Sequence, residues 1–234
     1  MRPRIAIDAM GGDEGPRIMV AGAALARHRH AGFQFLFVGD DAQIREALKD
    51  HPNLSAASEI LHAADVVSGE DKPGQALRGS KTTSMGMAVN AVKTGEVSAA
   101  VSAGNTGALM AIAKLALRTM PGIDRPALSA LLPTMKDTDV VMLDLGANTE
   151  CNSRNLVQFA VMGAAYSRIM HGFDRPKVKL LNIGTEEAKG TGTIQEAAAT
   201  LKGAAGLHMN FLGFTEADKI STGEVDVIVT DGFS

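Results

Sequence analysis

Short apolar runs alternate with longer segments of helical period along most of the chain, and this alternation constrains the fold more than any other feature. Clusters of Gly, Asn, Asp or Thr usually separate the two kinds of segment. Continuously apolar runs are typical of parallel strands, because helices cover both faces of such sheets. Strands that alternate with helices are the pattern of βα units. The sequence therefore predicts a doubly wound α/β fold.

The predicted elements follow this pattern, which is interrupted in two places. We predict strands at residues 4–8, 33–38, 99–102, 127–132, 140–145, 178–183 and 225–230, with a weaker one at 210–213, and helices at 16–29, 42–49, 84–93, 106–118, 156–170 and 194–202. Residues 134–139 are too few for a crossover helix, so the strands that flank them should pair antiparallel within a mixed sheet. The polar stretch 68–83 is too long for an ordinary connector and predicts a functional loop or a lid. Because no internal repeat or linker is visible, we expect residues 1–234 to form a single α/β unit.

Composition argues against several classes of function. The formal net charge is −3 and aromatic residues make up 4% of the chain, so neither a positive field nor a stacking surface favours nucleic acid as a partner. Cys151 is the only cysteine, which rules out an intrachain disulfide and fits a reducing cytosol. No apolar run approaches the ~18 residues that a membrane-spanning helix requires. We expect a cytoplasmic, globular protein.

Polar and glycine-rich segments follow five of the predicted strands. These segments cover residues 8–13, 102–107, 146–152, 184–191 and 231–232. The carboxyl ends of parallel strands meet at one edge of a sheet, where N–H groups of the following helices point toward a ligand. The segment 104–107, with Asn105 and Thr106, suits a phosphate or the oxyanion of a tetrahedral intermediate, because its small residues allow close approach. The alternative is turn chemistry, with Asn105 or Thr106 capping a helix.

The usual nucleotide and metal fingerprints are absent from the sequence. There is no G-x-x-x-x-G-K-[ST] motif, no clear G-x-G-x-x-G after a strand and no G-x-S-x-G elbow, and the six histidines show no metal-ligand spacing. We therefore expect no metal and no other cofactor. The segment 78–83, which includes Lys81, precedes a predicted helix and is a further candidate for an anion site. An N-cap flanked by two solvated cations explains that segment equally well.

Longer motifs extend across essentially the whole chain. They read IAIDAMGGD (5–13), VSAGNTGALM (101–110), PGIDRPAL (121–128), LDLGAN (143–148), LVQFAVMG (156–163), LLNIGTEEAKG (180–190) and DVIVTDGF (226–233). On these motifs the chain closely resembles the bacterial phosphate acyltransferases of phospholipid synthesis, which make acyl-phosphate from acyl-acyl carrier protein and inorganic phosphate. The resemblance implies a three-layer αβα sandwich with a mixed, mostly parallel sheet, similar to isocitrate and isopropylmalate dehydrogenases and to phosphotransacetylase.

The same resemblance implies how such an enzyme works in the cell. It implies a homodimer that needs no metal, works in the cytosol near the inner face of the membrane, and feeds a downstream membrane glycerol-phosphate acyltransferase. Acyl carrier proteins are acidic, so a local basic surface should meet them, and the weak candidates are Arg27, Arg29, Lys177 and Lys179. Relative to this family the chain is expected to lack the C-terminal third and to be poorly active without it.

The motifs lead to a hypothesis in which positioning dominates the chemistry. Phosphate is already a nucleophile and a thiolate is a fair leaving group, so the reaction needs no enzyme nucleophile. The catalytic candidates are Asn105, Thr106, Asn148, Glu186 and Asp231, and the substrate-binding candidates are Asp8, Gly11, Gly12, Lys81, Gly104, Gly107, Gly184 and Lys189. We expect Asn148 to face the segment 104–107. Either lysine would offset phosphate charge, and the carboxylates would orient donors or exchange a proton.

Three other functions stay open at this point. An acyl-CoA phosphotransferase would use the same chemistry on a different thioester. A non-catalytic module that binds acyl carrier protein is possible if the family's C-terminal third completes the active site. A dehydrogenase is suggested by fold analogy alone, and the missing dinucleotide fingerprint opposes it.

Overall fold

The computed structural model describes residues 3–204 and 206–232 and divides into two compact units, Met1–Arg118 and Thr119–Ser234. The last residue of the final motif, Phe233, lies outside the described residues. Each unit has its own sheet, of four strands in the first and five in the second, so the predicted strands divide between two sheets. A strand's sequence does not say which neighbour it joins. That the chain folds as a single unit stays a prediction, which unfolding measurements can test.

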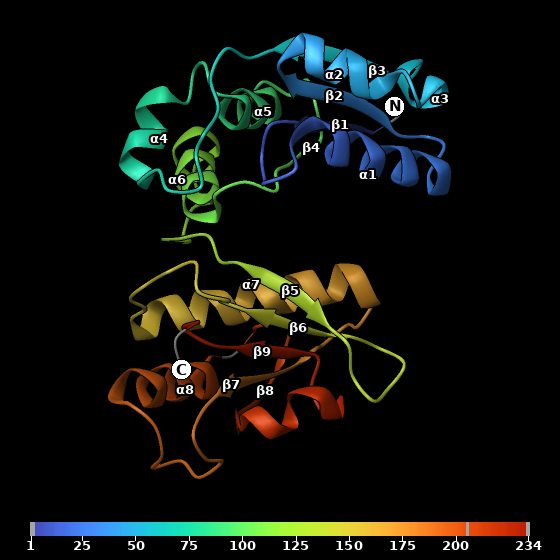
Figure 1. Ribbon diagram of the computed structural model, residues 1–234. Helices are drawn as coiled ribbons and strands as arrows, with labels where there is room; N and C mark the ends of the chain where they lie inside the picture. Colours follow the sequence, from blue (N-terminus) through green and yellow to red (C-terminus); the bar gives the residue numbers. More distant parts are fainter. Residues whose placement is uncertain (1–2, 205, 233–234) are drawn as a thin grey trace. The chain divides into compact units, whose positions relative to one another are not determined.

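The first unit is built on a wholly parallel sheet (Figure 1). Its strand order is β3-β2-β1-β4, with β1 at Arg4–Asp8, β2 at Gln34–Gly39, β3 at Ser58–His62 and β4 at Ala99–Val101. Its helices are α1 (Gly15–Arg29), α2 (Asp41–Leu48), α3 (Pro52–Ser55), α4 (Pro73–Gly79), α5 (Ser84–Lys93) and α6 (Thr106–Leu117).

Both faces of this first sheet are covered by helices. Phe35 and Phe37 point to one face, where they form a core with residues of α1, α2 and α3. Leu36 and Val38 alternate with them and pack on α5. On its far side α5 packs against α6, and Met85 is buried in that contact. The continuous apolar run in β2 is therefore explained by burial on both faces.

The second unit has a mixed sheet. Its strand order is β5-β6-β9-β7-β8, with β5 at Ser129–Leu132, β6 at Val140–Leu143, β7 at Lys177–Leu181, β8 at Asn210–Thr215 and β9 at Val227–Val229. Its helices are α7 (Ser153–His171), α8 (Gly192–Gly203) and the 3₁₀ helix η1 (Ala217–Thr222). β5 and β6 pair antiparallel, which confirms the prediction from the short connector, and the other pairs are parallel.

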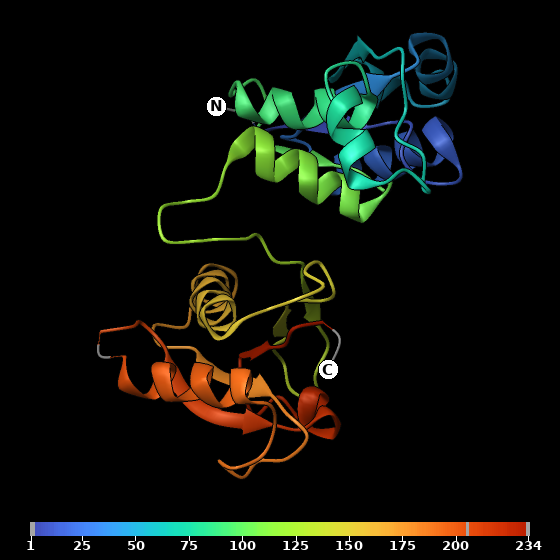
Figure 2. The same cartoon turned by 90° about the vertical axis from the view of Figure 1, so that its left-hand side faces the viewer.

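The two faces of the second sheet are covered differently. α7 and α8 pack side by side on one face, against a large core that includes Phe159 (Figure 2). On the other face, Val140 and Ile228 are buried in a smaller cluster, to which η1 contributes Ile220. The α/β class with mostly parallel strands is thus confirmed in both units.

Most predicted elements are confirmed to within a few residues, and the exceptions are short. Sequence reasoning missed β3, α3, α4 and η1. α4 lies inside the polar stretch 68–83, which is therefore partly helical and not simply a loop. Within the described part of the chain, no helix is both long enough and apolar enough to cross a membrane.

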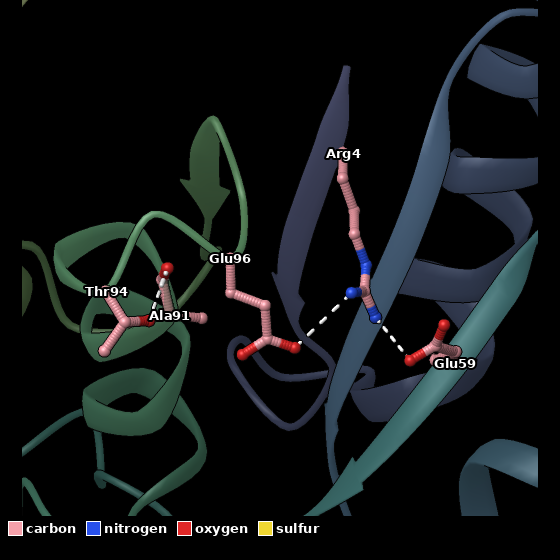
Figure 3. Close-up of polar contacts among 5 residues, drawn as sticks. All are labelled: Arg4, Glu59, Ala91, Thr94 and Glu96. Atoms are coloured by element: carbon pink, nitrogen blue, oxygen red, sulfur yellow. Dashed lines mark hydrogen bonds and ion pairs between the residues drawn. The ribbon is translucent and has the colours of Figure 1, made fainter. Parts of the chain in front are cut away.

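An ion-pair bridge ties strands together at the amino end of the first sheet. Figure 3 shows the guanidinium of Arg4 between two carboxylates, 2.7 Å from Glu59 of β3 and 3.4 Å from Glu96. In the same view, the Thr94 hydroxyl donates to the carbonyl of Ala91 at the end of α5. The carboxyl ends of the strands, where ligands bind in such sheets, lie at the opposite edge.

Candidate active site

The carboxyl ends of β1 and β4 lie side by side because the two strands are parallel neighbours. Asp8, the last residue of β1, is 1% exposed, and its Oδ2 accepts a 2.7 Å hydrogen bond from the Ser102 hydroxyl just beyond β4. The Ser102 oxygen in turn accepts a 3.1 Å bond from the N–H group of Gly104. The other carboxylate oxygen, Oδ1, is buried without a hydrogen-bond partner among the described residues. Asp8 therefore fixes the start of the 102–107 loop, and its contact with substrate stays a prediction.

Gly11 and Gly12 allow the loop after β1 to press against the loop after β4. A Cβ atom on Gly11 would lie 2.7 Å from Asp8 Oδ2 and 2.9 Å from Ser102 Oγ. Gly12 has φ +89°, and a Cβ there would lie 3.3 Å from Ala103. Any larger side chain at Gly11 would push the loops apart, so these two glycines serve the packing of the site.

Asn105 uses both ends of its amide inside the protein. Its Oδ1 accepts a 3.0 Å bond from the Ala108 N–H group and so caps α6. Its Nδ2 donates to the carbonyls of Ser68, Gly69 and Asp71 at 3.4, 2.9 and 3.0 Å. These bonds tie the polar stretch 68–83 to the start of α6. They favour the capping alternative, and a catalytic role for Asn105 stays a prediction.

Thr106 and Gly107 form the exposed first turn of α6. Helix geometry leaves the N–H groups of these first residues without an acceptor inside the helix, which makes them suitable donors to an anion. Lys81 does not join them. It lines a hollow beside the C-terminal half of α6, together with Leu115, about two helical turns from Gly107.

In the second unit, a buried aspartate organises the loop after β6. Asp144 is fully buried, and its Oδ1 accepts bonds from the N–H groups of Leu128 and Ala147. Its Oδ2 accepts 2.8 Å bonds from both the N–H and the Nδ2 of Asn148. Asn148 is 5% exposed and also donates to the Pro126 carbonyl. Its amide nitrogen is thus engaged in holding two loops together, and the prediction that Asn148 faces the 104–107 segment stays a prediction.

Asp231 follows the neighbouring strand, β9. There Gly232 has φ +79° and lies against the backbone of Gly146. Burial raises the pKa of the Cys151 thiol above its ordinary value, and the negative charges of Asp144 and Asp231 raise it further. The thiol is therefore a poor nucleophile at neutral pH, in agreement with a reaction that needs none.

The loop between β7 and α8 contains the remaining candidates. It is the orange loop that projects from the second unit in Figure 1. Asn182 braces the loop, since its Oδ1 accepts from the Ile183 N–H at 2.9 Å and its Nδ2 donates to the Lys189 carbonyl at 3.1 Å. A Cβ on Gly184 would lie 2.7 Å from the Glu186 carboxylate, so that carboxylate folds back over the loop. Lys189 and Glu186 are both exposed.

Glu187, the second carboxylate of this loop, forms an ion pair with Lys202 of α8. This contact lowers the pKa of Glu187 below its ordinary value. The weak basic candidates for a carrier surface lie elsewhere. Arg27 and Arg29 end α1, and Lys177 begins β7, so these three lie toward the amino ends of the strands in their respective units.

The candidates therefore form two groups, one in each unit. Asp8, Gly11, Gly12, Gly104, Asn105, Thr106 and Gly107 meet at the carboxyl ends of β1 and β4, while Asn148, Gly184, Glu186, Lys189 and Asp231 follow β6, β7 and β9. Sequence reasoning assigned no role to Ser102, Asp144 or Asn182, which build the two groups. Each directly follows an apolar run, and that position was the available signal. Among residues 3–204 and 206–232, no three His, Cys, Asp or Glu side chains gather closely enough to hold a metal ion.

Comparison with known proteins gives consistent results. A family model described as "Fatty acid synthesis protein" matches residues 3–234. The chain is 68% identical over 232 residues to a phosphate acyltransferase of Erythrobacter litoralis and 54% identical over 230 residues to one of Rhodospirillum centenum, covering 99% and 98% of this chain. It spans 65% and 64% of the length of those two relatives.

Solved structures share the fold at much lower identity. A phosphotransacetylase from Streptococcus pyogenes superposes with a TM-score of 0.68 at 19% identity, over 97% of this chain and 77% of that one. The EutD phosphotransacetylase from Staphylococcus aureus gives 0.67 at 17% identity, with the same coverage. The expected likeness to the phosphotransacetylase fold is confirmed.

Proposed function

The chain belongs to the family described as fatty acid synthesis proteins, and from this premise we propose that it forms acyl-phosphate from a fatty acyl thioester of acyl carrier protein and inorganic phosphate. The observation that carries the proposal is the 68% identity, across 99% of the chain, to a protein named phosphate acyltransferase. The chemistry of the two strand edges supports it, because both offer backbone N–H groups and small residues where an anion could bind.

The proposed reaction balances without an enzyme nucleophile. An oxygen of hydrogenphosphate attacks the carbonyl carbon of the thioester, and a tetrahedral intermediate forms. The carbon–sulfur bond then breaks, the sulfur leaves as a thiolate, and the proton of the phosphate ends on that sulfur. The products are acyl-phosphate and the free thiol of the carrier. The enzyme contributes orientation and stabilisation of negative charge.

The backbone at the start of α6 is the proposed anion donor. Thr106 and Gly107 present N–H groups there, and the Asp8–Ser102–Gly104 hydrogen bonds hold the preceding loop in place. Asn105 then acts by fixing the loop and the helix start, not by touching the reacting atoms. Lys189, exposed after β7 in the second unit, stays a predicted substrate-binding residue.

We also propose the partners that the family suggests. They are acyl carrier protein, inorganic phosphate, a second copy of the chain in a homodimer, and a membrane glycerol-phosphate acyltransferase that consumes the product close to the inner face of the membrane. If acidic carrier protein is the donor, raising the ionic strength should raise its KM. A clear preference for CoA thioesters in steady-state kinetics would instead favour the acyl-CoA phosphotransferase.

A pair of variants at one residue tests the anion site. Thr106→Pro removes the N–H group at the first position of α6, where proline fits the helix and where the extended backbone of Asn105 tolerates a following proline. Thr106→Val keeps the N–H group and removes only the hydroxyl. We expect Thr106→Pro to lower kcat by ~10²-fold and Thr106→Val to stay near the parent protein, with both folded by circular dichroism. Full activity in Thr106→Pro would show that the N–H group at the start of α6 is not the anion donor. If the parent protein formed no acyl-phosphate from any acyl thioester, the proposed function itself would be refuted.

A further inference from the structure

An open hollow of about 740 Å³ lies at the carboxyl end of β7, where the β7–α8 loop, the start of α8 and the start of η1 meet. Its lining includes the apolar residues Leu181, Ile183, Ile194 and Ala217. Binding cavities for small molecules are typically ~300–1,000 Å³ and mostly apolar, so this hollow falls in that range. None of the residues predicted as catalytic or substrate-binding lines it.

Ile183 is the most informative residue of the lining. It is 82% exposed, although the side chain is large and apolar and stands within the candidate loop. A single exposed isoleucine needs no explanation by itself. Here it borders an apolar hollow, in a segment whose other residues are polar except for the glycines and Ala188. The exposed side chain therefore adds apolar surface at the mouth of the hollow.

The walls of the hollow are held open by hydrogen bonds. Asn182 bonds to the N–H of Ile183 and to the carbonyl of Lys189, which fixes both ends of the loop. Gly190 packs directly against the Asn182 side chain, with φ +88°. Gln195 of α8 also donates to the Ala188 carbonyl at 2.9 Å. The loop is thus braced on both sides and does not need to rearrange to keep the hollow.

The hollow continues the row of candidate residues along one sheet edge. β7 pairs with β9, whose end leads to Asp231, and β9 pairs with β6, whose end leads to Asn148. Neighbouring strands are ~4.8 Å apart, so the end of β7 at the hollow lies one strand spacing from the end of β9 and two from the end of β6. A molecule whose polar head lies at β9 and β6 could extend an apolar tail into it.

The charges at the rim decide which part of a ligand fits. Glu216 and Asp218 line the hollow on the η1 side, and Asp218 is paired with Lys219 at 3.1 Å. Carboxylates at this position repel phosphate or a free carboxylate, so the charged end of a ligand is directed away from η1. An uncharged hydrocarbon chain is not opposed by them.

We propose that this hollow binds the hydrocarbon chain of the acyl donor, and that Ile183 and Ala217 determine the chain length that is accepted. The inference rests on the proposed function, because only that function supplies an acyl chain at this sheet edge. Each methylene group buried from water improves affinity by about four-fold. The hollow should therefore make kcat/KM rise steeply with chain length until the space is filled.

A matched pair of isoleucines tests the mouth of the hollow. Ile183 and Ile169 are 82% and 81% exposed, and Ile169 lies on α7, away from the hollow. We measure kcat/KM for thioesters of increasing chain length with Ile183→Asp and Ile169→Asp. Ile183→Asp should lower the ratio of kcat/KM for long chains to kcat/KM for short chains by about ten-fold or more, equivalent to two methylene groups. Ile169→Asp should keep the parent profile. Equal profiles for both variants would overturn the proposal while the acyltransferase function stands.

A second pair tests the depth of the hollow by filling it. Ala217→Phe should shorten the longest chain that is accepted, whereas Ala199→Phe, on the exposed side of α8, should not. A direct readout keeps the inference separate from the function. Binding of cis-parinaric acid, a fluorescent fatty acid, is measured on the same four variants without turnover. Loss of acyl-phosphate formation from every donor would refute the function. Probe affinity unaffected by Ile183→Asp and Ala217→Phe would refute the hollow as a chain site, whatever the activity.

Discussion

Asp8 and Asp144 occupy equivalent places in the two units, at the carboxyl end of a buried strand, yet they are used differently. Asp144 accepts four hydrogen bonds, from three backbone N–H groups and the Asn148 amide. The Asp8 carboxylate accepts a hydrogen bond from the Ser102 hydroxyl, and its Oδ1 is buried without a partner among the described residues. Both side chains are essentially inaccessible, with exposed fractions of 0% and 1%.

The difference shows that one residue type at one topological position can serve two purposes. A carboxylate that accepts four bonds has no capacity left, so Asp144 is a structural pivot for the loops on either side of it. A buried acceptor without a donor is costly, and such groups are uncommon in native structures. The first unit therefore keeps an unused hydrogen-bond acceptor at its strand edge, on Asp8. In the second unit, every acceptor of Asp144 is used to hold the loops in place.

The same substitution at both aspartates gives the largest expected effect. Asp144→Asn places an NH₂ group against two N–H donors, whichever way the amide turns, and should lower the free energy of unfolding by about 3–5 kcal/mol. Asp8→Asn can keep the Ser102 bond and turn its NH₂ toward the unpartnered side, so it should change stability by about 1 kcal/mol or less. Urea denaturation of both variants measures the difference. Equal losses would show that the two carboxylates are used alike.

A glycine pair within the first unit sharpens the comparison for activity. Gly11→Ala forces a methyl group to within 2.7 Å of Asp8 Oδ2 and should separate the two loops, costing about 1–3 kcal/mol and ten-fold or more in kcat. Gly22→Ala meets nothing within 4 Å on the exposed side of α1 and should stabilise the helix by about 0.5–1 kcal/mol. Thermal melts and initial rates of both variants are compared. An active Gly11→Ala would mean that the close packing of these loops is not needed.

Cys151 reports the negative charge at the strand edge of the second unit. Because burial and two carboxylates raise its pKa, alkylation by iodoacetamide should be slow at pH 8 and its midpoint should lie above that of a free thiol. Folding favours the protonated thiol. Its contribution to the free energy of unfolding is therefore fully present below the pKa of Cys151 in the unfolded chain, and it is lost as the pH rises through the pKa in the folded protein. Asp231→Asn should move the alkylation midpoint down. An unchanged midpoint would place the charge of Asp231 too far away to matter.

The smallest expected effect belongs to the exposed ion pair of the β7–α8 loop. Lys202 lowers the pKa of Glu187 in the folded protein. The contribution of the pair to the free energy of unfolding is therefore present above the ordinary pKa of glutamate and is lost as the pH falls through the lowered pKa. NMR titration should place the Glu187 midpoint below that of a free glutamate, and Lys202→Met should raise it. The melting temperature should not change measurably, since exposed pairs contribute little. A clear drop would show that this loop is held by charge as well as by Asn182.

Periodicity predicted most of the elements, and the motifs predicted where the strand edges lie. The helix α4 within the polar stretch 68–83 was not predicted, because it is only seven residues long. The contacts of this stretch are with Asn105 and α6, and local sequence does not reveal them. Site roles were harder to predict. The sequence predicts Asn105 as a catalytic donor and Asn148 as a residue that faces it. The structure adds contacts in which both amides hold loops together, which local sequence does not reveal, and the catalytic roles stay predictions.

The two aspartates also differ in how far along the chain their partners lie, and this has a consequence for the order of folding. Asp144 bonds to Asn148, four residues away, whereas Asp8 bonds to Ser102 across 94 residues. Closing a longer loop costs more entropy, and contacts between distant segments form slowly. We therefore expect the Asp8–Ser102 contact to be among the last to form during folding, after β2 and β3 have joined β1. A nascent or partly unfolded chain would then lack the proposed anion site at α6 even when most of its helices are present, so the proposed activity would report on completed folding of the first unit.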